Sequence, residues 1–281
     1  MTVIWENMVS LNANSDEYIA PIQSAGHYDG EKLQPRLQIP YAEEIKKDPY
    51  PLPAPKGREG YYGEHHLNYW MSGLKDSHEI MRVYQDATGM KPARYMDFGG
   101  ASGRVARHML LQHDVQEVWI ADINRQHVNF TLDIFEGRIK AFQSTSLPHL
   151  PFEDNSLDLI SAFSVFSHIE TFDETWLLEL RRVIRPGGLI IATANVDTFQ
   201  DINENWPVYK ALANHPEFDK TRFGKPLPEK RLVVRWNAGG SYSSVVYLSS
   251  DYVETRWKPF FSEFRVIPYL TQFQSGVVMR K

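Results

Sequence analysis

The chain has 281 residues, of which 42% are hydrophobic and 23% charged, and its formal net charge at pH 7 is −5. These values are typical of a globular protein with room for one large α/β domain and an appendage, or for two small domains. The acidic balance argues against nucleic acid as the main partner, because its phosphate backbone attracts a basic surface. The sequence contains no cysteine, which excludes disulfides, zinc–thiolate centres and cysteine nucleophiles.

The beginning of the chain has neither the basic segment nor the apolar core of a signal peptide. No apolar run reaches the roughly 20 residues that a membrane-spanning helix needs. We therefore expect a cytoplasmic protein without a transmembrane segment.

Residues 1–60 have no clear hydrophobic period and contain "KDPYPLPAPKG", in which every second residue from position 49 to 55 is proline. Proline disfavours helix in the residue before it, so an extended connector is predicted within an irregular N-terminal extension. Residues 61–90 have a helical pattern, in which Ser77 is a candidate N-cap and Gly89 a candidate end.

From residue 91 onward, predicted strands and helices alternate. The strands are expected at residues 93–98, 117–122, 157–166 and 189–195, and the helices at 104–113 and 173–184. The last two strands are continuously apolar, as in strands that are buried on both faces. Thr171 and Glu174 have the spacing of a capping box for the second helix. The alternation predicts a parallel sheet covered by helices.

After Asn195 the alternation ends, and residues 198–248 are interpreted as an insert. Two antiparallel strands are expected on either side of an Asn-Ala-Gly-Gly turn at 237–240. A helix over 251–261 should follow, capped by Ser250 or Asp251. The closing strands, at 264–270 and 276–281, are expected to form an antiparallel pair.

The stretch "MDFGGASGR" at 96–104 joins the first predicted strand to a helix. Gly99 and Gly103 leave room for a ligand to lie against the backbone, and the helix start offers unpaired N–H groups. Asp122 ends the next strand, where a carboxylate can accept hydrogen bonds from two ribose hydroxyls. These features suit either NAD or S-adenosylmethionine.

Two observations favour S-adenosylmethionine. The G-x-G-x-x-G pattern of NAD sites is not met, because Ala101 and Arg104 occupy two of its positions. In addition, the carboxylate of Asp97 would repel a pyrophosphate but suits a cationic amino-acid group and a sulfonium.

Over about residues 91–195 the chain resembles the class I S-adenosylmethionine-dependent methyltransferases. Asp97, Gly99 and Gly103 match the family's acidic-x-Gly-x-Gly-x-Gly motif, with Ala101 in place of the middle glycine. Residues 150–169 and 180–193 resemble its fourth-strand and fifth-strand blocks. The resemblance implies a Rossmann-like, seven-stranded, mostly parallel sheet with helices on both faces and an antiparallel last strand, spanning 91–281. It also implies S-adenosylmethionine as cofactor and no metal.

The resemblance implies that Asp122 binds ribose and that Asp97 faces the methionine amino group. Where the family often has an adenine-binding Asp, this chain has three hydroxyl residues at 144–146, so the adenine contact stays open. The expected cofactor-binding residues are Asp97, Gly99, Gly100, Ala101, Gly103, Asp122, Ile123, Ser144, Thr145, Ser146, Phe163 and Ser164.

In this family a segment like 61–90 often forms a lid over cofactor and acceptor, although a surface loop is an equal alternative for 61–70. The candidate general bases are His65, His66 and His168; His168 is alternatively a histidine bonded to backbone. A basic cluster in the insert indicates either an anionic acceptor or a solvated loop. The expected acceptor-binding residues are Tyr61, Tyr62, Glu64, Trp70, Arg222 and Arg235.

The C-terminal pattern is similar to bacterial methyltransferases of glycan and small-molecule pathways. The favoured function is therefore O-methylation of a hydroxylated small molecule or a glycan sugar by direct SN2 transfer. Two alternatives stay open: N-methylation of a small amine, and a non-catalytic binding protein with the methyltransferase fold. An oligomer is possible.

Overall fold

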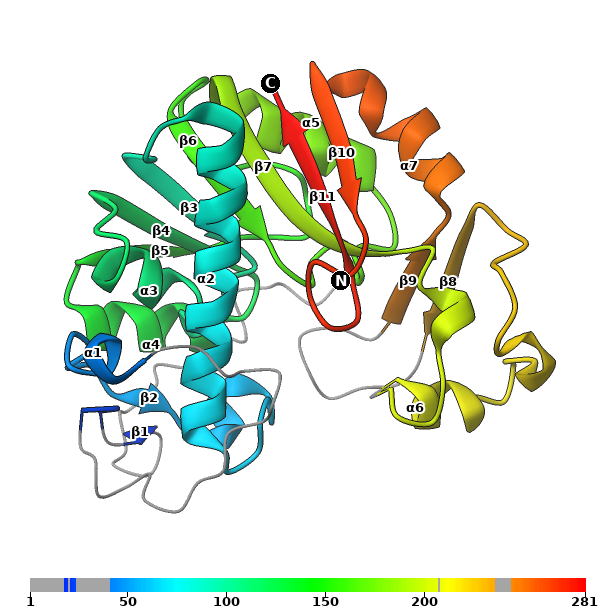
Figure 1. The fold of residues 1–281 in the computed structure, drawn as a ribbon, viewed down its shortest axis with the longest axis horizontal. Helices are drawn as coiled ribbons and strands as arrows, with labels where there is room; N and C mark the ends of the chain where they lie inside the picture. Colours follow the sequence, from blue (N-terminus) through cyan, green and yellow to red (C-terminus); the bar gives the residue numbers. More distant parts are fainter. Residues whose placement is uncertain (1–17, 20, 24–40, 207, 236–243) are drawn as a thin grey trace. The chain divides into compact units, whose positions relative to one another are not determined.

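The computed structural model describes residues 18–19, 21–23, 41–206, 208–235 and 244–281 (Figure 1). The chain divides into two compact units, Met1–Thr145 and Ser146–Lys281. Each unit is described by itself below.

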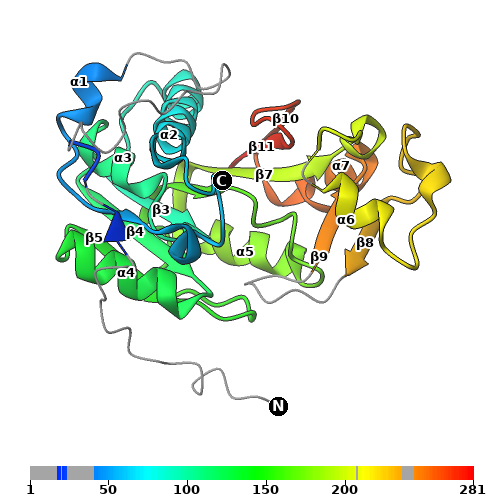
Figure 2. The ribbon, with the colours of Figure 1, turned by 90° about the horizontal axis from the view of Figure 1, so that it is seen from below.

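The sheet of the first unit contains three parallel strands, β3 (Arg94–Phe98), β4 (Glu117–Asp122) and β5 (Ile139–Gln143). They are connected by helices α3 (Ala106–Leu111) and α4 (Arg125–Phe135), which lie beside the strands in Figure 2. These elements confirm the predicted strand–helix alternation. Since the strands are parallel, the turns after β3 and β4 leave the sheet at the same edge.

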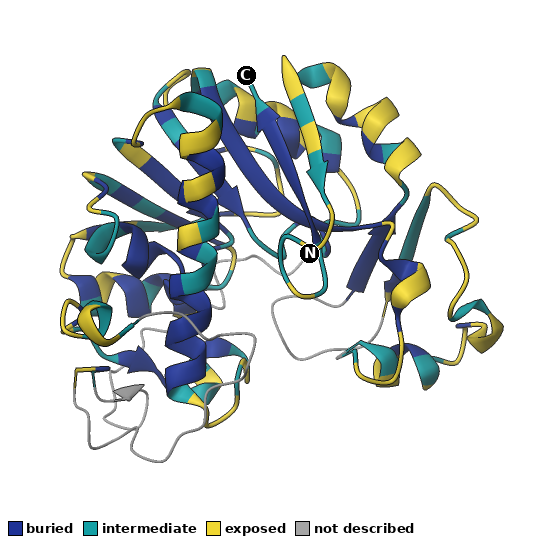
Figure 3. Ribbon diagram, viewed as in Figure 1, coloured by how far each residue is buried: buried dark blue, intermediate teal, exposed yellow. Residues whose placement is uncertain are grey.

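Helix α2 (His66–Thr88) covers the first unit with a largely buried N-terminal half (Figure 3). It ends at Gly89, as predicted, with a φ of 66°. Ser77 is not its N-cap, because this residue lies inside the helix and its hydroxyl donates to the Leu74 carbonyl. Neither α2 nor another helix in the described ranges is long and apolar enough to cross a membrane.

A glycine in the middle of α2 lets the helix approach the backbone that follows the glycine-rich turn. A Cβ atom on Gly73 would lie 1.9 Å from the carbonyl oxygen of Arg104. Any side chain there would force the helix away from the turn. The sequence pattern alone did not indicate this role.

The described part of the N-terminal extension is anchored by a buried ion pair. It contains β1 (Tyr18–Ile19), α1 (Ala42–Ile45), β2 (Leu52–Pro53) and a 3₁₀ helix (Pro55–Arg58). The carboxylate of Asp48 lies 2.8 Å from Nε of Arg107, and neither side chain is exposed. The indole N–H of Trp70 donates to the same carboxylate. The proline-rich stretch is thus extended only at β2 before it turns into the 3₁₀ helix; the remainder of residues 1–40 lies outside the described residues.

The sheet of the second unit is of mixed direction. Strands β6 (Leu157–Ala162) and β7 (Ile184–Val196) are parallel and are connected by α5 (Asp173–Val183). Strand β11 (Ser275–Arg280) is antiparallel to both β7 and β10 (Glu263–Ile267). The antiparallel closing pair is confirmed. The parallel pairs β3–β4, β4–β5 and β6–β7 agree with the predicted mostly parallel sheet. The count of seven strands stays a prediction.

Two details of the second unit differ from the prediction. Strand β6 ends at Ala162 rather than continuing to residue 166. The capping box is also wrong, because the residue before α5 is Phe172 in a left-handed conformation, with no side-chain cap. Glu174 instead forms an ion pair with Arg256.

The insert has a hydrophobic core of its own. Strands β8 (Arg231–Arg235) and β9 (Ser244–Leu248) are antiparallel, as predicted, and β9 also pairs in parallel with the end of β7. The predicted turn at 237–240 lies outside the described residues. Short helix α6 (Tyr209–Ala213) precedes the hairpin, and α7 (Ser250–Arg256) follows it. The cap of α7 is Ser249, one residue before the predicted pair. The buried core consists of Phe199, Ile202, Leu212, Phe218, Val234, Val245 and Tyr247.

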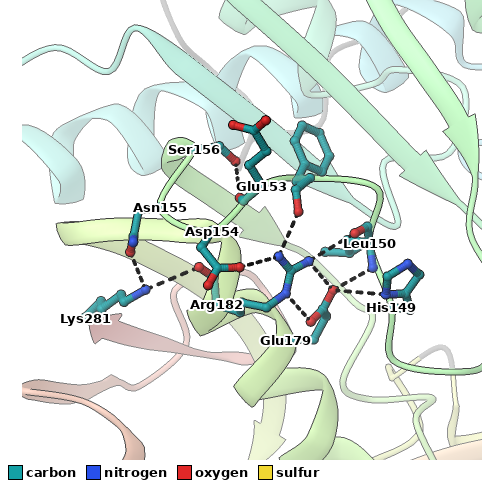
Figure 4. Close-up of polar contacts among 10 residues, drawn as sticks. His149, Leu150, Glu153, Asp154, Asn155, Ser156, Glu179, Arg182 and Lys281 are labelled. Atoms are coloured by element: carbon teal, nitrogen blue, oxygen red, sulfur yellow. Dashed lines mark hydrogen bonds and ion pairs between the residues drawn. The ribbon is translucent and has the colours of Figure 1, made fainter.

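The loop before β6 is held by Arg182 of α5, as Figure 4 shows. Its guanidinium donates to the carbonyls of Leu150 and Phe152 and forms ion pairs with Asp154 and Glu179. These contacts of Arg182 fix the local structure of the loop.

Candidate functional site

The turn after β3 requires residues without large side chains. Gly99, Ala101 and Gly103 have φ values of 73°, 47° and 80°, all in the left-handed region. A Cβ on Gly100 would come within 2.9 Å of the Asp97 side chain. Alanine at position 101 tolerates this conformation at a cost of about 1 kcal/mol. The turn thus exposes backbone where a ligand can lie close to it.

Asp122 connects this turn to the one after β4. Its Oδ2 accepts the Ala101 N–H at 2.8 Å, and its Oδ1 accepts the Asn124 N–H at 2.8 Å. An ionised carboxylate has about four acceptor positions, so these bonds leave capacity for two further donors. The residues therefore fit a ribose with two vicinal hydroxyls.

The 3₁₀ segment of the N-terminal extension packs on the same turns. The Ser102 hydroxyl donates to the Gly57 carbonyl at 2.6 Å, and the Asn124 amide donates to the Glu59 carboxylate at 3.1 Å. Buried His127 has its Nδ1 3.5 Å from Asp122 and its Nε2 3.9 Å from Glu59. Sequence reasoning missed Gly57 and Glu59 because they lie 45 and 65 residues from their partners along the chain.

The residues expected near adenine have contrasting exposure. Ile123 is 44% exposed although it is apolar, and its carbonyl accepts from the Gln143 side chain. Ser144 is buried, and its N–H donates to the Asp122 carbonyl. Thr145 is exposed, and Ser146 is exposed in the second unit. Ile123 and Ser144 therefore both lie next to Asp122, as the prediction of an adenine site beside a ribose-binding residue requires.

The expected acceptor residues of 61–70 do not form one cluster. Trp70 is fully buried and its N–H is bonded to Asp48, so its assignment to the acceptor site is corrected to a core role. Tyr62 is half-buried against the ring edge of Tyr69. Tyr61 and Glu64 are exposed.

His66 is poorly suited to act as a general base. Its Nδ1 lies 2.7 Å from Nη2 of Arg58, a group that can only donate, so Nδ1 must be the acceptor. The proton of the neutral ring is then on Nε2, which lies 3.5 Å from Glu64. Both nitrogens are thereby engaged, whereas neighbouring His65 is exposed.

His168 has the opposite tautomer. Its Nδ1 lies 2.6 Å from the Ser244 carbonyl oxygen, which can only accept, so this nitrogen carries the proton. The neutral ring therefore carries its lone pair on Nε2, the form that a general base needs. The backbone bond and the base role, which the sequence posed as alternatives, are compatible.

The turn after β6 holds Phe163, which is half-buried, and Ser164, whose φ of 58° is unusual for a residue other than glycine. The Ser164 N–H donates to Thr193 Oγ1 at 2.8 Å, and its hydroxyl donates to Gln274 Oε1 at 3.0 Å. Thr193 and Gln274 were not identified from the sequence, since no motif contains them.

The basic cluster of the insert is largely neutralised by acidic partners. Arg222 pairs with Glu229 and lies over the ring of Phe199. Arg235 pairs with Glu170 at 2.5 Å. The structure thus favours the interpretation of these side chains as local ion pairs over a site for an anionic acceptor. Among the residues described, no group of three or more metal-ligating side chains is present.

The comparisons with known proteins converge on one family. Residues 96–192 match the family model of the methyltransferase domain. The ubiquinone/menaquinone biosynthesis C-methyltransferase UbiE of Cupriavidus taiwanensis is 26% identical over 148 residues, which are 51% of this chain and 60% of that protein. The UbiE protein of Neisseria meningitidis serogroup C is 30% identical over 104 residues, which are 36% of this chain and 42% of that one.

The matched region thus spans about 60% of the length of the first of these relatives. A solved S-adenosylmethionine-dependent methyltransferase from Methanosarcina mazei has a TM-score of 0.49 and 15% identity, covering 71% of this chain and 96% of that one. The matched residues 96–192 contain the glycine-rich turn, Asp122 and the strands β4 to β6. Residues 96–192 therefore match a methyltransferase domain, in agreement with the resemblance of this region to the class I S-adenosylmethionine-dependent methyltransferases.

Proposed function

We propose that the chain transfers the methyl group of S-adenosylmethionine to a neutral, oxygen-bearing small molecule. The observation that carries this proposal is the coincidence of the family match at 96–192 with the glycine-rich turn and Asp122. A hydroxyl oxygen of a small molecule or of a glycan sugar is the first candidate acceptor.

The first unit supplies the groups that would hold the cofactor. Asp122 would accept the ribose hydroxyls with its remaining lone pairs, and Ile123 would lie against the adenine ring. The carboxylate of Asp97 would attract the methionine amino group. When bound, the cofactor supplies a methyl group activated by a positive sulfur, whose electron pair stays on sulfur when the methyl leaves.

The second unit supplies the favoured base. His168 Nε2 would take the proton of the acceptor hydroxyl as the oxygen, or a carbon conjugated with it, bonds to the methyl group. A weak base is sufficient, since most of the rate acceleration in such a transfer comes from alignment of the reacting atoms.

Charge favours a neutral acceptor over a phosphate. The arginines first considered for anion binding, Arg222 and Arg235, are each paired with a glutamate. Binding a phosphate there would require an existing ion pair to break. A sugar hydroxyl or a phenol has no such requirement.

C-methylation is the second candidate, and the names of the relatives favour it. The UbiE proteins are C-methyltransferases of ubiquinone and menaquinone biosynthesis. Deprotonation of a quinol hydroxyl makes the adjacent ring carbon nucleophilic, so O- and C-methylation would need the same base. C-methylation differs in that a ring carbon faces the methyl group and afterwards loses its hydrogen as a proton to a base, which restores the aromatic ring.

We further propose that any lid is confined to the turn at Tyr61–His65, since α2 is part of the core of its unit. The domain boundaries and a cytoplasmic location also stay proposals.

The test is an acceptor panel with S-adenosylmethionine labelled by ¹³C in its methyl group. The panel contains 1,4-dihydroxynaphthalene, catechol, methyl α-D-glucopyranoside, glucose 6-phosphate and benzylamine. Mass spectrometry detects transfer, and the ¹³C shift of the product distinguishes methyl on oxygen, carbon or nitrogen. We expect transfer to a neutral hydroxylated compound, and transfer slowed about tenfold or more with Asp122→Ala at a cofactor concentration below saturation.

Transfer to benzylamine alone would favour the N-methyltransferase alternative. S-adenosylhomocysteine binding without turnover of any compound in a widened panel would favour the non-catalytic alternative. Transfer to glucose 6-phosphate in preference to the sugar would contradict the neutral acceptor.

A further inference from the structure

Three neutral side chains form a closed hydrogen-bonded triangle at the carboxyl end of β6 and β7. Thr193 Oγ1 lies 2.6 Å from Gln274 Oε1, Ser164 Oγ lies 3.0 Å from the same oxygen, and the Ser164 N–H donates to Thr193 Oγ1. These residues come from three separate segments of the second unit. Ligands of open α/β sheets bind at this end of the strands.

The hydroxyl of Thr193 determines the orientation of the Gln274 carboxamide. This hydroxyl is fully buried and already accepts the Ser164 N–H, so its own proton needs an acceptor. Gln274 Oε1 provides that acceptor, and it takes the Ser164 hydroxyl proton as well. The Nε2 group of Gln274 is consequently directed away from the triangle, with two N–H donors.

Those donors have no hydrogen-bond partner among the residues that the structure describes, and Gln274 is half-buried. The turn that carries it is fixed at several points. The Tyr269 hydroxyl donates to Asp201, and the Phe273 ring packs on Trp206 at 5.0 Å. The insert thereby holds the turn in place, and Gln274 has little freedom to adjust.

Strain supports a functional role for this arrangement. Ser164 is held at a φ of 58°, which glycine would adopt without cost, yet its side chain is used in the triangle. Strained backbone of this kind is concentrated at functional sites. The hydrogen bonds of the triangle use both hydroxyl groups and Gln274 Oε1, and they leave the two Nε2 N–H donors of Gln274 in a fixed direction. Such donors are suited to binding an acceptor group of a ligand.

We infer that Gln274 is a specificity-determining residue, which donates a hydrogen bond from Nε2 to a neutral oxygen of the methyl acceptor. This inference rests on the proposed function. A carboxamide carries no charge and therefore suits a hydroxyl or carbonyl oxygen, whereas a phosphate or carboxylate is usually bound by arginine or lysine.

The variant Gln274→Glu isolates the two donors. It keeps the shape of the side chain and an oxygen that accepts from Ser164 and Thr193, but it replaces N–H donors by a second acceptor. Gln272 is an exposed glutamine in the same turn, so Gln272→Glu makes the same change of charge as a matched control.

Each protein is first titrated calorimetrically with S-adenosylhomocysteine. The complex is then titrated with 1,4-dihydroxynaphthalene, methyl α-D-glucopyranoside and glucose 6-phosphate, while ¹⁵N–¹H spectra follow the side-chain amide signals. We expect at least one neutral probe to shift the Gln274 amide signals of the unmutated protein and leave those of Gln272 in place. Gln274→Glu should weaken binding of that probe about tenfold or more, with affinity for S-adenosylhomocysteine unchanged.

The inference is overturned if neither neutral probe moves the Gln274 signals, if the phosphate binds more tightly than both, or if the two glutamate variants behave alike. A parallel loss of S-adenosylhomocysteine affinity in Gln274→Glu would show a structural role instead. Failure of the proposed function looks different, because the unmutated protein would then not bind S-adenosylhomocysteine at all.

Discussion

The turn after β3 and the turn after β6 are both chain reversals at the end of a strand, but different groups hold them in place. Each reverses the chain at the carboxyl end of a parallel strand and holds residues at positive φ. The first turn is built from glycines, with the carboxylate of Asp122 bonded to backbone N–H groups. The second turn has no glycine, and its strained Ser164 is held by neutral side chains. A ligand group that donates hydrogen bonds suits the first turn, and an uncharged group that accepts them suits the second.

The interactions that hold the two turns in place also differ in charge. Helix α3, which follows the first turn, is joined to the N-terminal extension by the buried Asp48–Arg107 pair. The triangle that holds the second turn contains no charge. The first region should therefore be sensitive to loss of a charge, and the second to loss of a hydroxyl.

The largest effect is expected from Arg107→Met. The substitution leaves the Asp48 carboxylate buried without its cation, which should reduce the free energy of unfolding by about 3–5 kcal/mol. This reduction is measured by urea unfolding, with circular dichroism as the signal. Lys46→Met serves as control, because its pair with Glu43 is exposed to solvent and should contribute nothing measurable. Equal stability of the two variants would show that the buried pair is not the anchor.

Thr193→Val tests the second region. Valine has the same shape but leaves the Ser164 N–H without its acceptor, at a cost of about 1–3 kcal/mol in unfolding free energy. Thr131→Val is the matched control, since Thr131 is equally buried but its hydroxyl only supplements a helical carbonyl. If both variants lose the same stability under urea, the triangle has no special role.

The first region should also lose stability in mild acid. Burial, together with the nearby charge of His78, lowers the pKa of His113 to about 4. The unfolded chain, with a pKa near 6.5, then binds more protons than the folded chain between these values. Stability is therefore full above pH 6.5 and falls as the pH drops toward 4, on the order of 2 kcal/mol for this group.

Urea unfolding of the unmutated protein and His113→Gln across that pH range measures this contribution. The variant should show a smaller decrease in stability. Parallel curves for the two proteins would assign the acid sensitivity to other groups.

The smallest effect is expected from glycine substitutions at the two residues with left-handed backbone, Ala101 and Ser164. Ala101→Gly removes left-handed strain and should raise the unfolding free energy by about 0.5 kcal/mol after the entropy cost of glycine. Ser164→Gly relieves similar strain but also loses the hydroxyl bond to Gln274, so no gain is expected. Thermal unfolding of the pair compares them directly. A gain of stability in Ser164→Gly alone would show that the hydroxyl bond of Ser164 to Gln274 does not offset the backbone strain.

The features that were predictable from the sequence are those that depend on local pattern. The alternation of strands and helices, the direction of the closing strands and the turn at 99–103 depend on local pattern, and all are present in the structure. The predicted caps at Ser77 and Thr171 are wrong because tertiary packing places these helix ends elsewhere.

The partners of the candidate site were less predictable. Gln274 lies 110 residues from Ser164 along the chain, and Glu59 lies 65 residues from Asn124. No local sequence pattern indicates contacts between residues so far apart along the chain. Likewise, the tautomers of His66 and His168 depend on which atom lies next to Nδ1, a fact that only the folded chain provides.

Calorimetric titration with S-adenosylhomocysteine tests the central claim most directly. The protein is compared with Asp122→Ala, and with Asp133→Ala, which alters an exposed carboxylate on α4. We predict micromolar binding by the unmutated protein and by Asp133→Ala, and a loss of about tenfold or more in Asp122→Ala. No binding by the unmutated protein, or equal binding by all three, would contradict the assignment of the cofactor site to the turns after β3 and β4.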